Sequence, residues 1–402
     1  MEKKVCVLGL GYIGLPTASI LANKGYDVLG VDVSKKIVDT INRGEIHIVE
    51  PDLDVLVKSA VNSGQLTASL NPASADIFYI CVPTPFKEDH KPDISYVISA
   101  TESILPYVKK GNLVILESTS PPKTTLKVAE ILKKTGFAIG EEVFVAHAPE
   151  RVLPGKILHE AIYNDRIIGG INDKSAQICQ QFYKTFVQGN IYVTDSVTAE
   201  MAKLCENSFR DVNIAFANEL SMIADKLEID VWELIDLANK HPRVNILKPG
   251  PGVGGHCLAV DPWFIVDAVP KETKLIRTAR EINDFKPDFI LGKIKQAAAK
   301  FKKPVIGCLG LAYKPDIDDL RESPAKVIVQ KLLKEKVGEI LVCEPNVKED
   351  EVESMKLSSL VELMEKADIV VGLVGHKEFR EMERSVLAEK IVIDACGMWE
   401  MI

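Results

Sequence analysis

The loop 249–261 holds the residue whose type and setting best suit covalent chemistry, Cys257. Four of the six residues from 250 to 255 are glycines, so backbone near this thiol could approach a substrate closely. An exposed thiol beside a cationic group is rich in thiolate and nucleophilic. Two other interpretations stay open, namely a loop cysteine without a role and a metal site formed by His256 and Cys257.

Lys203, Asn207 and Arg210 share one face of an expected helix, because they are spaced i, i+4, i+7. A cationic stripe of this kind is often only solvated. It could also stabilise an oxyanion, with the lysine as proton donor and acceptor and the asparagine amide as a fixed donor.

Two further segments place polar groups at the ends of expected strands. Glu150-Arg151 would set a base beside an anion-binding guanidinium. Tyr313-Lys314 and Arg321 supply further cations near the start of the last domain.

A second kind of chemistry is indicated at the N-terminus, where Gly9, Gly11 and Gly14 form GxGxxG between a strand and a helix. The first glycine permits the turn, the second lets backbone approach a pyrophosphate, and the third lets helix and strand pack closely. The helix N-terminus would then face the anion. A dinucleotide site is therefore expected here.

The choice of dinucleotide depends on Asp32, at the end of the second strand. A carboxylate there accepts hydrogen bonds from the ribose hydroxyls and repels a 2'-phosphate, which favours NAD over NADP. Lys35 or Lys36 could instead hold a 2'-phosphate, so the preference need not be strict. Loops containing Thr84 and Thr119 follow later strands, at the edge where such sheets bind ligands.

The elements that must position these residues alternate between strand and helix, which predicts an α/β fold with doubly wound parallel sheets. In the first domain, strands are expected at 5–10, 27–33, 77–82, 113–116, 143–146, 166–169 and 191–193, with helices at 15–24, 97–108, 123–134 and 175–186.

The middle of the chain is predicted to be helical. One long helix should run from Ser196, a plausible N-cap, to Leu227, followed by a short helix at 232–238 and a helical hairpin at 271–301. Strands at 304–309, 339–343, 368–374 and 390–394 then indicate a second Rossmann-like domain. We expect three domains: NAD-binding at 1–195, central and dimerising at 196–301, and substrate-binding at 302–402.

Composition excludes some classes of protein. The 402 residues carry a formal net charge of -8, which opposes binding to nucleic acid. No apolar run is long enough to span a bilayer, and the N-terminus is unlike a signal peptide, so we expect a cytoplasmic protein without a membrane partner.

Taken in order along the chain, these motifs resemble the UDP-glucose/GDP-mannose dehydrogenase family of NAD-dependent nucleotide-sugar 6-dehydrogenases. The match covers nearly the whole chain. The residues that carry it are Gly9 to Gly14, Thr84-Pro85, Glu117-Ser118-Thr119, Glu150-Arg151, Lys203 with Asn207, the GGHC segment with Asp261, and Tyr313-Lys314 with Arg321.

The resemblance implies a reaction in which C6 of a nucleotide sugar is oxidised by four electrons to a carboxylate, with two NAD consumed. Cys257 would form a thiohemiacetal and then a thioester, Lys203 and Asn207 would stabilise oxyanions, and Asp261 would orient the hydrolytic water, with Glu150 assisting as a base. By the same resemblance, Gly9, Gly11, Tyr12, Ile13, Gly14, Asp32, Lys36, Thr84, Thr119 and Arg321 would bind the cofactor, and Glu150, Arg151, Val152, Lys203, Asn207, Arg210, His241, Arg243, Gly254, Tyr313 and Lys314 the UDP-sugar.

The sequence departs from the UDP-glucose branch at His256 and Val260, where that branch has serine and lysine. It is more similar to the branch acting on N-acetylhexosamines, and closest to the UDP-N-acetyl-D-mannosamine dehydrogenases. UDP-N-acetylglucosamine, UDP-N-acetylgalactosamine and UDP-glucose remain open as substrates. A two-electron β-hydroxyacid dehydrogenase and a non-catalytic NAD-binding protein are the alternatives from other classes. A homodimer or higher homo-oligomer, formed through the long helix, is expected.

Overall fold

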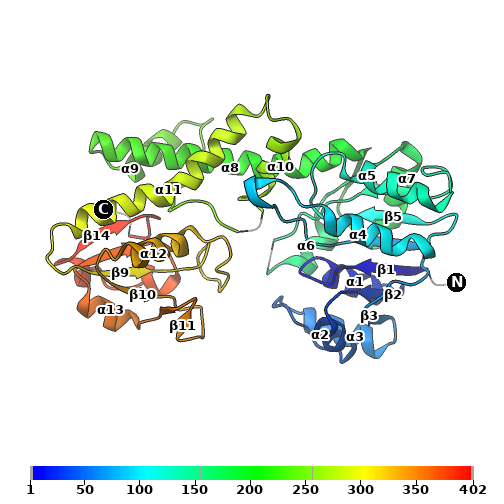
Figure 1. Ribbon diagram of the computed structural model, residues 1–402, viewed down its shortest axis with the longest axis horizontal. Helices are drawn as coiled ribbons and strands as arrows, with labels where there is room; N and C mark the ends of the chain where they lie inside the picture. The colour runs from blue at the N-terminus through cyan, green and yellow to red at the C-terminus, as the bar shows by residue number, and fades with distance from the viewer. Residues whose placement is uncertain (1–2, 154, 256, 400–402) are drawn as a thin grey trace. The chain divides into compact units, whose positions relative to one another are not determined.

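A computed structural model, drawn in Figure 1, describes residues 3–153, 155–255 and 257–399. It contains two compact units, which are described separately: Met1–Glu206 with Trp263–Val269, and Asn207–Pro262 with Pro270–Ile402. The helix α8 (Ser196–Leu227) contributes its first turns to unit 1 and the rest to unit 2.

Unit 1 is built on an eight-stranded sheet with the order β3-β2-β1-β4-β5-β6-β7-β8. The strand order reverses between β1 and β4, which is the switch point at which doubly wound sheets bind dinucleotides. The strands are β1 (Lys4–Leu8), β2 (Asp27–Val31), β3 (Leu66–Ser69), β4 (Ile77–Ile80), β5 (Leu113–Leu116), β6 (Phe144–His147), β7 (Arg166–Gly170) and β8 (Ile191–Asp195).

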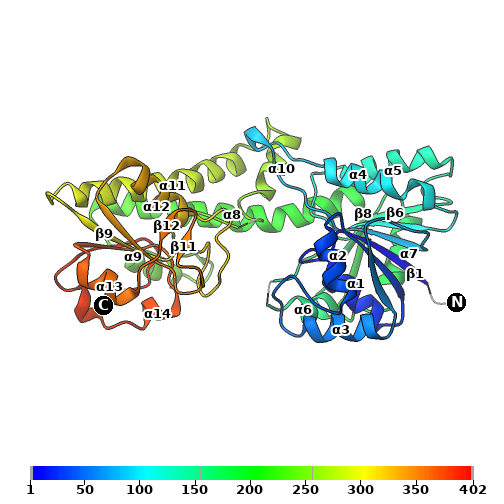
Figure 2. The same ribbon diagram turned by 60° about the horizontal axis from the view of Figure 1, so that its bottom comes forward.

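Alternating side chains of these strands supply two apolar cores, one on each face of the sheet. Val5 and Val7 point to one core, whereas Cys6 and Leu8 point to the other. Helices α1, α3, α6 and α7 cover the first face, and α4 and α5 cover the second (Figure 2). The helices of unit 1 are α1 (Gly14–Asn23), α2 (Lys35–Asn42), α3 (Leu53–Asn62), α4 (Ser95–Ile104), α5 (Thr124–Leu132), α6 (Ile157–Tyr163), α7 (Asp173–Tyr183) and α10 (Asp261–Ala268), with short 3-10 turns at Glu88–His90, Leu105–Tyr107 and Lys133–Thr135.

The doubly wound α/β class is confirmed, with two differences in this sheet. The strand β3 was missed, because Leu66–Ser69 is short and only its first residue is buried. The sheet is also not wholly parallel, since β6 pairs with β7 antiparallel through Ala146 and His147. The chain returns through α6 without the crossover that a parallel pair requires.

The long helix of the middle region has the expected bounds, but its cap is one residue earlier than expected. Asp195 accepts hydrogen bonds from the backbone N–H and the hydroxyl of Thr198, so Asp195 rather than Ser196 caps the helix. The helix α9 (Val231–Asn239) follows, capped by Asp230.

The expected hairpin at 271–301 is wrong: a single helix, α11 (Lys274–Ala298), runs through Pro287. The apolar residues Ile290, Leu291 and Ile294 on the far side of the proline keep packing into a core, which holds the helix together across it.

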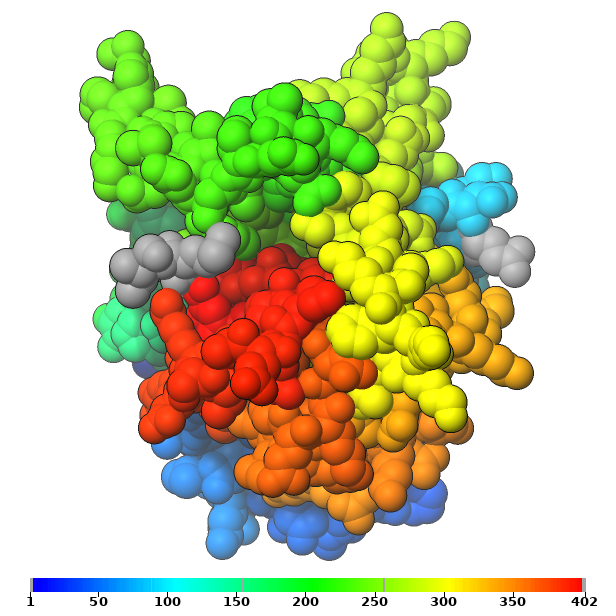
Figure 3. All heavy atoms as spheres, turned by 90° about the vertical axis from the view of Figure 1, so that its left-hand side faces the viewer, coloured from blue at the N-terminus to red at the C-terminus, as the bar shows by residue number. Residues whose placement is uncertain are grey.

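The second sheet, in unit 2, has the order β10-β9-β13-β14 and is parallel throughout. Helices α11 and α12 pack on one face of it, and the yellow α11 lies along the orange and red C-terminal segment in Figure 3. The elements are β9 (Val305–Leu309), α12 (Pro324–Glu335), β10 (Glu339–Cys343), β11 (Glu351–Val352), β12 (Met355–Lys356), α13 (Leu360–Lys366), β13 (Ile369–Gly372), α14 (Lys377–Arg380), a 3-10 turn (Arg384–Leu387) and β14 (Ile391–Asp394).

Among the helices of the described residues, none combines the length and the apolar composition that crossing a membrane requires.

Candidate active site

The glycine-rich loop between β1 and α1 leaves no room for side chains at two of its three glycines. Gly9 has φ +91°, and a Cβ there would lie 2.6 Å from the carbonyl oxygen of Cys81. A Cβ on Gly14 would lie 1.8 Å from the carbonyl oxygen of Gly9. The loop is therefore folded tightly against the end of β4, as a dinucleotide loop requires.

The middle glycine, Gly11, instead faces open space, because among the described residues no atom beyond its chain neighbours lies within 4 Å of the position of its Cβ. The first backbone N–H groups of α1 donate no hydrogen bond to a capping side chain, because the N-cap residue is Ile13. An open glycine beside an uncapped helix N-terminus fits a pyrophosphate. Tyr12 lies between them and is 43% exposed.

Asp32 follows β2 and is held beside this loop by backbone. Its Oδ2 accepts from the N–H of Leu10 at 3.1 Å, and its Oδ1 from the N–H of Ser34 at 2.9 Å. Each oxygen keeps a lone pair that can accept a ribose hydroxyl. Lys35 forms an ion pair with Asp39 at 2.7 Å, whereas Lys36 is exposed.

Replacing Asp32 by glycine should lower the ratio of kcat/KM for NAD to that for NADP by about 10- to 100-fold, because hydrogen bonds to a charged group contribute roughly 1.5–3 kcal/mol. Steady-state kinetics with both cofactors measures the ratio. Asp39→Asn, which alters a surface carboxylate on the neighbouring helix, should leave it unchanged. An unchanged ratio in Asp32→Gly would show that Asp32 does not contact the ribose.

Two predicted cofactor loops meet at the carboxyl ends of β4 and β5. The hydroxyl of Thr84 donates to the carbonyl oxygen of Thr119 at 2.6 Å. The hydroxyl of Ser118 donates to the carbonyl oxygens of Ile80 and Val82. These contacts fix both loops on the side of the sheet beyond the switch point.

Glu150 is buried and forms an ion pair with a buried arginine of the same unit. Its Oε1 lies 2.7 Å from Nη1 of Arg166, on β7, and accepts from the backbone N–H of Arg151. The Arg151 guanidinium, which was predicted to bind an anion, forms an ion pair with Glu206 of α8 at 2.7 Å. Val152 is half-buried against the apolar core.

The thiol of Cys257 is exposed, on the loop that leads into α10. Its carbonyl oxygen accepts from the N–H groups of Val260 and Asp261, which folds the loop into the first turn of that helix. The side-chain amide of Asn207 donates to Asp261 at 2.5 Å, so the helix α8 reaches this loop directly. Lys203 lies one turn earlier on α8 and is half-buried, whereas Arg210 is exposed. His256 lies outside the described residues.

Side chains that the sequence did not single out hold this loop in place. The amide oxygen of Asn218 accepts from the N–H of Gly250 at 2.9 Å. Arg280 is 1% exposed, pairs with buried Asp211 at 2.6 Å and donates to the carbonyl oxygen of Leu258. Nothing local in the sequence separates these residues from surface charges, since their role depends on the packing of α11 against α8.

The substrate residues predicted in the C-terminal part also lie around this loop. Cβ atoms on Gly254 and Gly255 would each lie 2.9 Å from the side chain of Tyr313, so that ring packs directly on the two glycines. Lys314 lies over the same ring at 5.8 Å. Arg321, predicted to bind the cofactor, forms a bidentate pair with Asp319. His241 and Arg243 are exposed.

The structure thus gathers the predicted residues into two groups. Unit 1 carries the glycine-rich loop, Asp32, the Thr84 and Thr119 loops, Glu150 and Lys203. Unit 2 carries Asn207, Cys257, Asp261, Gly254 and Tyr313 within one set of contacts.

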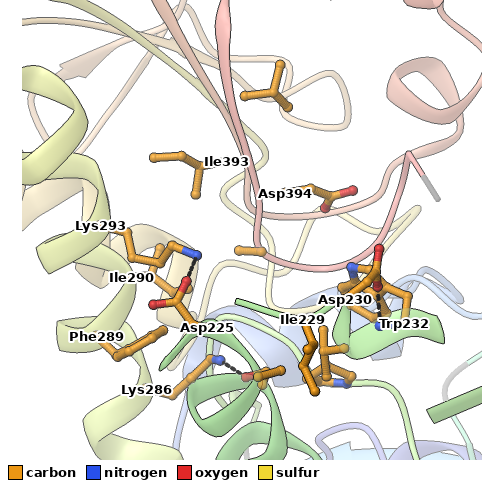
Figure 4. Close-up of a pocket in the computed structure, with 16 residues that line it drawn as sticks. Asp225, Ile229, Asp230, Trp232, Lys286, Phe289, Ile290, Lys293, Ile393 and Asp394 are labelled. Carbon is orange, nitrogen blue, oxygen red and sulfur yellow. Dashed lines mark hydrogen bonds and ion pairs between the residues drawn. The ribbon is translucent and has the colours of Figure 1, made fainter. Parts of the chain in front are cut away.

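A cavity of about 250 Å³ lies elsewhere in unit 2, among α8, α9, α11 and β14 (Figure 4). None of the predicted site residues lines it. Lys293 pairs with Asp225, and Asp230 and Asp394 each accept backbone N–H groups. Lys286 donates to the hydroxyl of Ser221, and burial lowers its pKa to about 8. The charged lining is satisfied within the chain, so we assign no chemistry to this cavity.

Comparison with known proteins agrees with this geometry. Models of the NAD binding, central and UDP binding domains of the UDP-glucose/GDP-mannose dehydrogenase family match residues 3–187, 197–285 and 307–401. The chain is 56% identical over 394 residues to the UDP-N-acetyl-D-mannosamine dehydrogenase of Campylobacter jejuni, covering 94% of this chain and 97% of that one. It is 54% identical over 407 residues to an NDP-N-acetyl-D-galactosaminuronic acid dehydrogenase of Ralstonia nicotianae, covering 99% and 96%.

A solved structure, the UDP-D-ManNAc dehydrogenase of Pyrococcus horikoshii, superposes with a TM-score of 0.91 at 41% identity, over 99% of this chain and 96% of that one. Together with the dinucleotide loop and the cysteine loop, these matches show that the chain belongs to the UDP-glucose/GDP-mannose dehydrogenase family and is an NAD-dependent UDP-sugar dehydrogenase.

Proposed function

We propose that the protein oxidises C6 of UDP-N-acetyl-D-mannosamine to the carboxylate of UDP-N-acetyl-D-mannosaminuronate. The balanced reaction takes the alcohol, two NAD+ and one water to the carboxylate, two NADH and three protons. The observation that carries the proposal is the exposed Cys257 thiol, four residues before an Asp261 carboxylate that is hydrogen-bonded to Asn207. A two-electron alcohol oxidation has no use for a nucleophile, whereas an aldehyde-to-acid oxidation needs a covalent adduct or a hydrate.

NAD, when bound, accepts a hydride at each oxidation step. Residues of this chain carry out the other chemical steps. The Cys257 thiolate adds to the aldehyde carbon, and the carbonyl oxygen takes a proton, giving a thiohemiacetal. Loss of a hydride and of the hydroxyl proton turns it into a thioester. Water then displaces the thiol and leaves the carboxylate.

We assign the remaining roles to polar groups that match the family motif. One of them, Asp261, is also close to Cys257 in the chain. Asn207 and Lys203, one turn apart on α8, stabilise the oxyanions, and Asp261 orients the hydrolytic water. Glu150 serves as a base, and its ion pair with Arg166 holds the carboxylate in place. Loops at the ends of β4, β5 and β9 contribute the cofactor and substrate contacts.

The NADH formed per UDP-sugar consumed tests the reaction type. The proposal requires a ratio near two, and a ratio near one would identify a two-electron dehydrogenase. The same assay run over UDP-N-acetylmannosamine, UDP-N-acetylglucosamine, UDP-N-acetylgalactosamine and UDP-glucose tests the substrate. The Campylobacter relative favours the first, and the Ralstonia relative favours the galacto sugar as second candidate.

We also propose that the protein is a cytoplasmic homodimer, with a central domain at 196–301 between its NAD-binding and UDP-sugar-binding domains. Large apolar side chains stay exposed along one stripe of α8, at positions that repeat every four or seven residues. They are Phe209 at 72%, Phe216 at 51%, Ile223 at 46% and Leu227 at 63% exposure. Sedimentation equilibrium tests the dimer, and a monomer at micromolar concentration would contradict it.

A further inference from the structure

A carboxyl group that forms no ion pair among the described residues is buried directly after β5, beneath the cofactor loop. Glu117 is 3% exposed. Its Oε2 accepts from the thiol of Cys81 at 2.9 Å and more weakly from the hydroxyl of Thr17 at 3.5 Å. In the part of the chain that the structure describes, no cation and no backbone N–H group hydrogen-bonds to it. Thiols and hydroxyls are poor substitutes for water around a carboxylate.

The cation that acts on Glu117, Arg166, is paired with a different carboxylate. Arg166 lies 2.7 Å from Glu150, so Glu117 experiences a neighbouring negative charge as well as burial. Burial first, and then repulsion from Glu150, raise the pKa of Glu117 to about 8. At neutral pH Glu117 therefore holds a proton.

The other groups around Glu117 do not titrate near neutral pH. Tyr79 and Cys81 face it from β4 and its end, and Cys179 and Tyr183 from α7; burial raises the pKa of each. Burial lowers the pKa of the Arg166 guanidinium, on β7, but the acidic neighbours, Glu150 first, raise it by more, so Arg166 stays charged. Thr17, on α1, has no charge to lose. Glu117 is thus the member of this cluster that can exchange a proton near pH 8.

The position of Glu117 relative to the cofactor follows from the sheet. A Cβ on Gly14 would lie 3.2 Å from the Cβ of Cys81, whose thiol bonds Glu117. Asp32 marks the adenosine end of the site on β2, and the strand order reverses between β1 and β4. The nicotinamide end must then fall on the β4 and β5 side, where Cys81 and Glu117 lie.

We propose that Glu117 distinguishes the two redox states of the cofactor, giving up its proton when NAD+ binds and keeping it when NADH binds. The oxidised nicotinamide ring carries a positive charge and the reduced ring does not. Opposite charges attract strongly where water is excluded, so the ionised carboxylate is favoured only beside the oxidised ring. This inference rests on NAD as the cofactor and not on the identity of the sugar.

The expected dependence on pH follows from linkage. Below pH 8 the unliganded protein holds the proton, so NAD+ must displace it, and the affinity for NAD+ should rise by up to about tenfold per pH unit. Above pH 8 the proton is already gone and the affinity should level off. NADH affinity should be flat to pH 8, and about one proton should be released per NAD+ bound at pH 7, with almost none for NADH.

Calorimetric titrations of the full-length protein with NAD+ and NADH measure the affinity and the number of protons released. They are run at pH 6 to 9 and in buffers of different ionisation enthalpy. Glu117→Gln should bind NAD+ with an affinity independent of pH and without proton release. Glu130→Gln, a change of an exposed glutamate on α5, should behave like the wild type. Proton release that persists in Glu117→Gln, or that is absent from the wild type, would overturn the proposal.

A second variant can test the proposal if Glu117→Gln does not fold. The thiol of Cys81 lowers the pKa of Glu117 by donating to its oxygen. In Cys81→Ala, the pH at which the NAD+ affinity stops rising should therefore be higher than in the wild type. No movement of that pH would count against Glu117 as the linked group.

Discussion

Cys257→Ala should reduce formation of the sugar acid by roughly 10⁴-fold or more, as loss of a catalytic nucleophile does in other enzymes. The reason is chemical: an unhydrated aldehyde has no hydride that can leave until a nucleophile has added to its carbon. NADH release with UDP-N-acetylmannosamine, read together with acid formation, measures the effect. NAD+ binding by the variant should stay normal, because Cys257 and the dinucleotide loop belong to different units.

Cys205→Ala is the matched control. Cys205 is also exposed, and it lies on α8 two residues after Lys203, so it points away from the face that carries Lys203 and Asn207. This variant should keep full activity. Unimpaired turnover in Cys257→Ala itself would favour the two-electron β-hydroxyacid dehydrogenase.

Gly14→Ala should destabilise unit 1 by about 3 kcal/mol or more, the upper range for forced overpacking. Its methyl group would lie 1.8 Å from the carbonyl oxygen of Gly9, which is backbone and cannot rotate away. Thermal unfolding followed by circular dichroism should show Tm lowered by roughly 6–12 °C, at about 2–4 °C per kcal/mol for a unit of this size.

Gly11→Ala separates the steric role from the binding role. No atom lies within 4 Å of that Cβ position, so the variant should fold with a wild-type Tm. Its methyl group would nevertheless occupy the approach to the pyrophosphate, and NAD+ affinity should fall about 10- to 100-fold if one hydrogen bond to the charged group is lost. An unchanged NAD+ affinity in Gly11→Ala would show that the open space at Gly11 is not a binding surface.

The dinucleotide loop was predictable from sequence because its demands are local. Gly14 meets the backbone of Gly9 within the same turn and Gly9 itself needs a positive φ, so a short motif suffices to find them. The main strands were predictable for a similar reason, since Val5 and Val7 alternate with Cys6 and Leu8. The antiparallel β6–β7 pair could not be foreseen, because the direction of a strand leaves no mark on its own residues.

At the candidate site, the roles that could not be predicted from the sequence depend on contacts between segments that are distant in the chain. Arg151 looked like an anion-binding residue, yet its guanidinium pairs with Glu206, 55 residues away in the chain. Arg280 had no apparent role, although it is buried behind the cysteine loop. Glu117 was part of a family motif, but its burial beside Cys81 and Glu150 emerges only from the packing of three strands.

The 32-residue span of α8 restricts how such a protein can evolve. Lys203, Asn207 and Asn218 all depend on one unbroken helix for their alignment. Inserting or deleting a single residue between them would rotate everything beyond it by about 100° and move it by about 1.5 Å. Substitutions at exposed positions outside the apolar stripe of Phe209, Phe216, Ile223 and Leu227 can accumulate, whereas a change of length cannot. Lineages that acquire new sugar specificities should therefore vary their loops and keep the count of residues along α8 fixed.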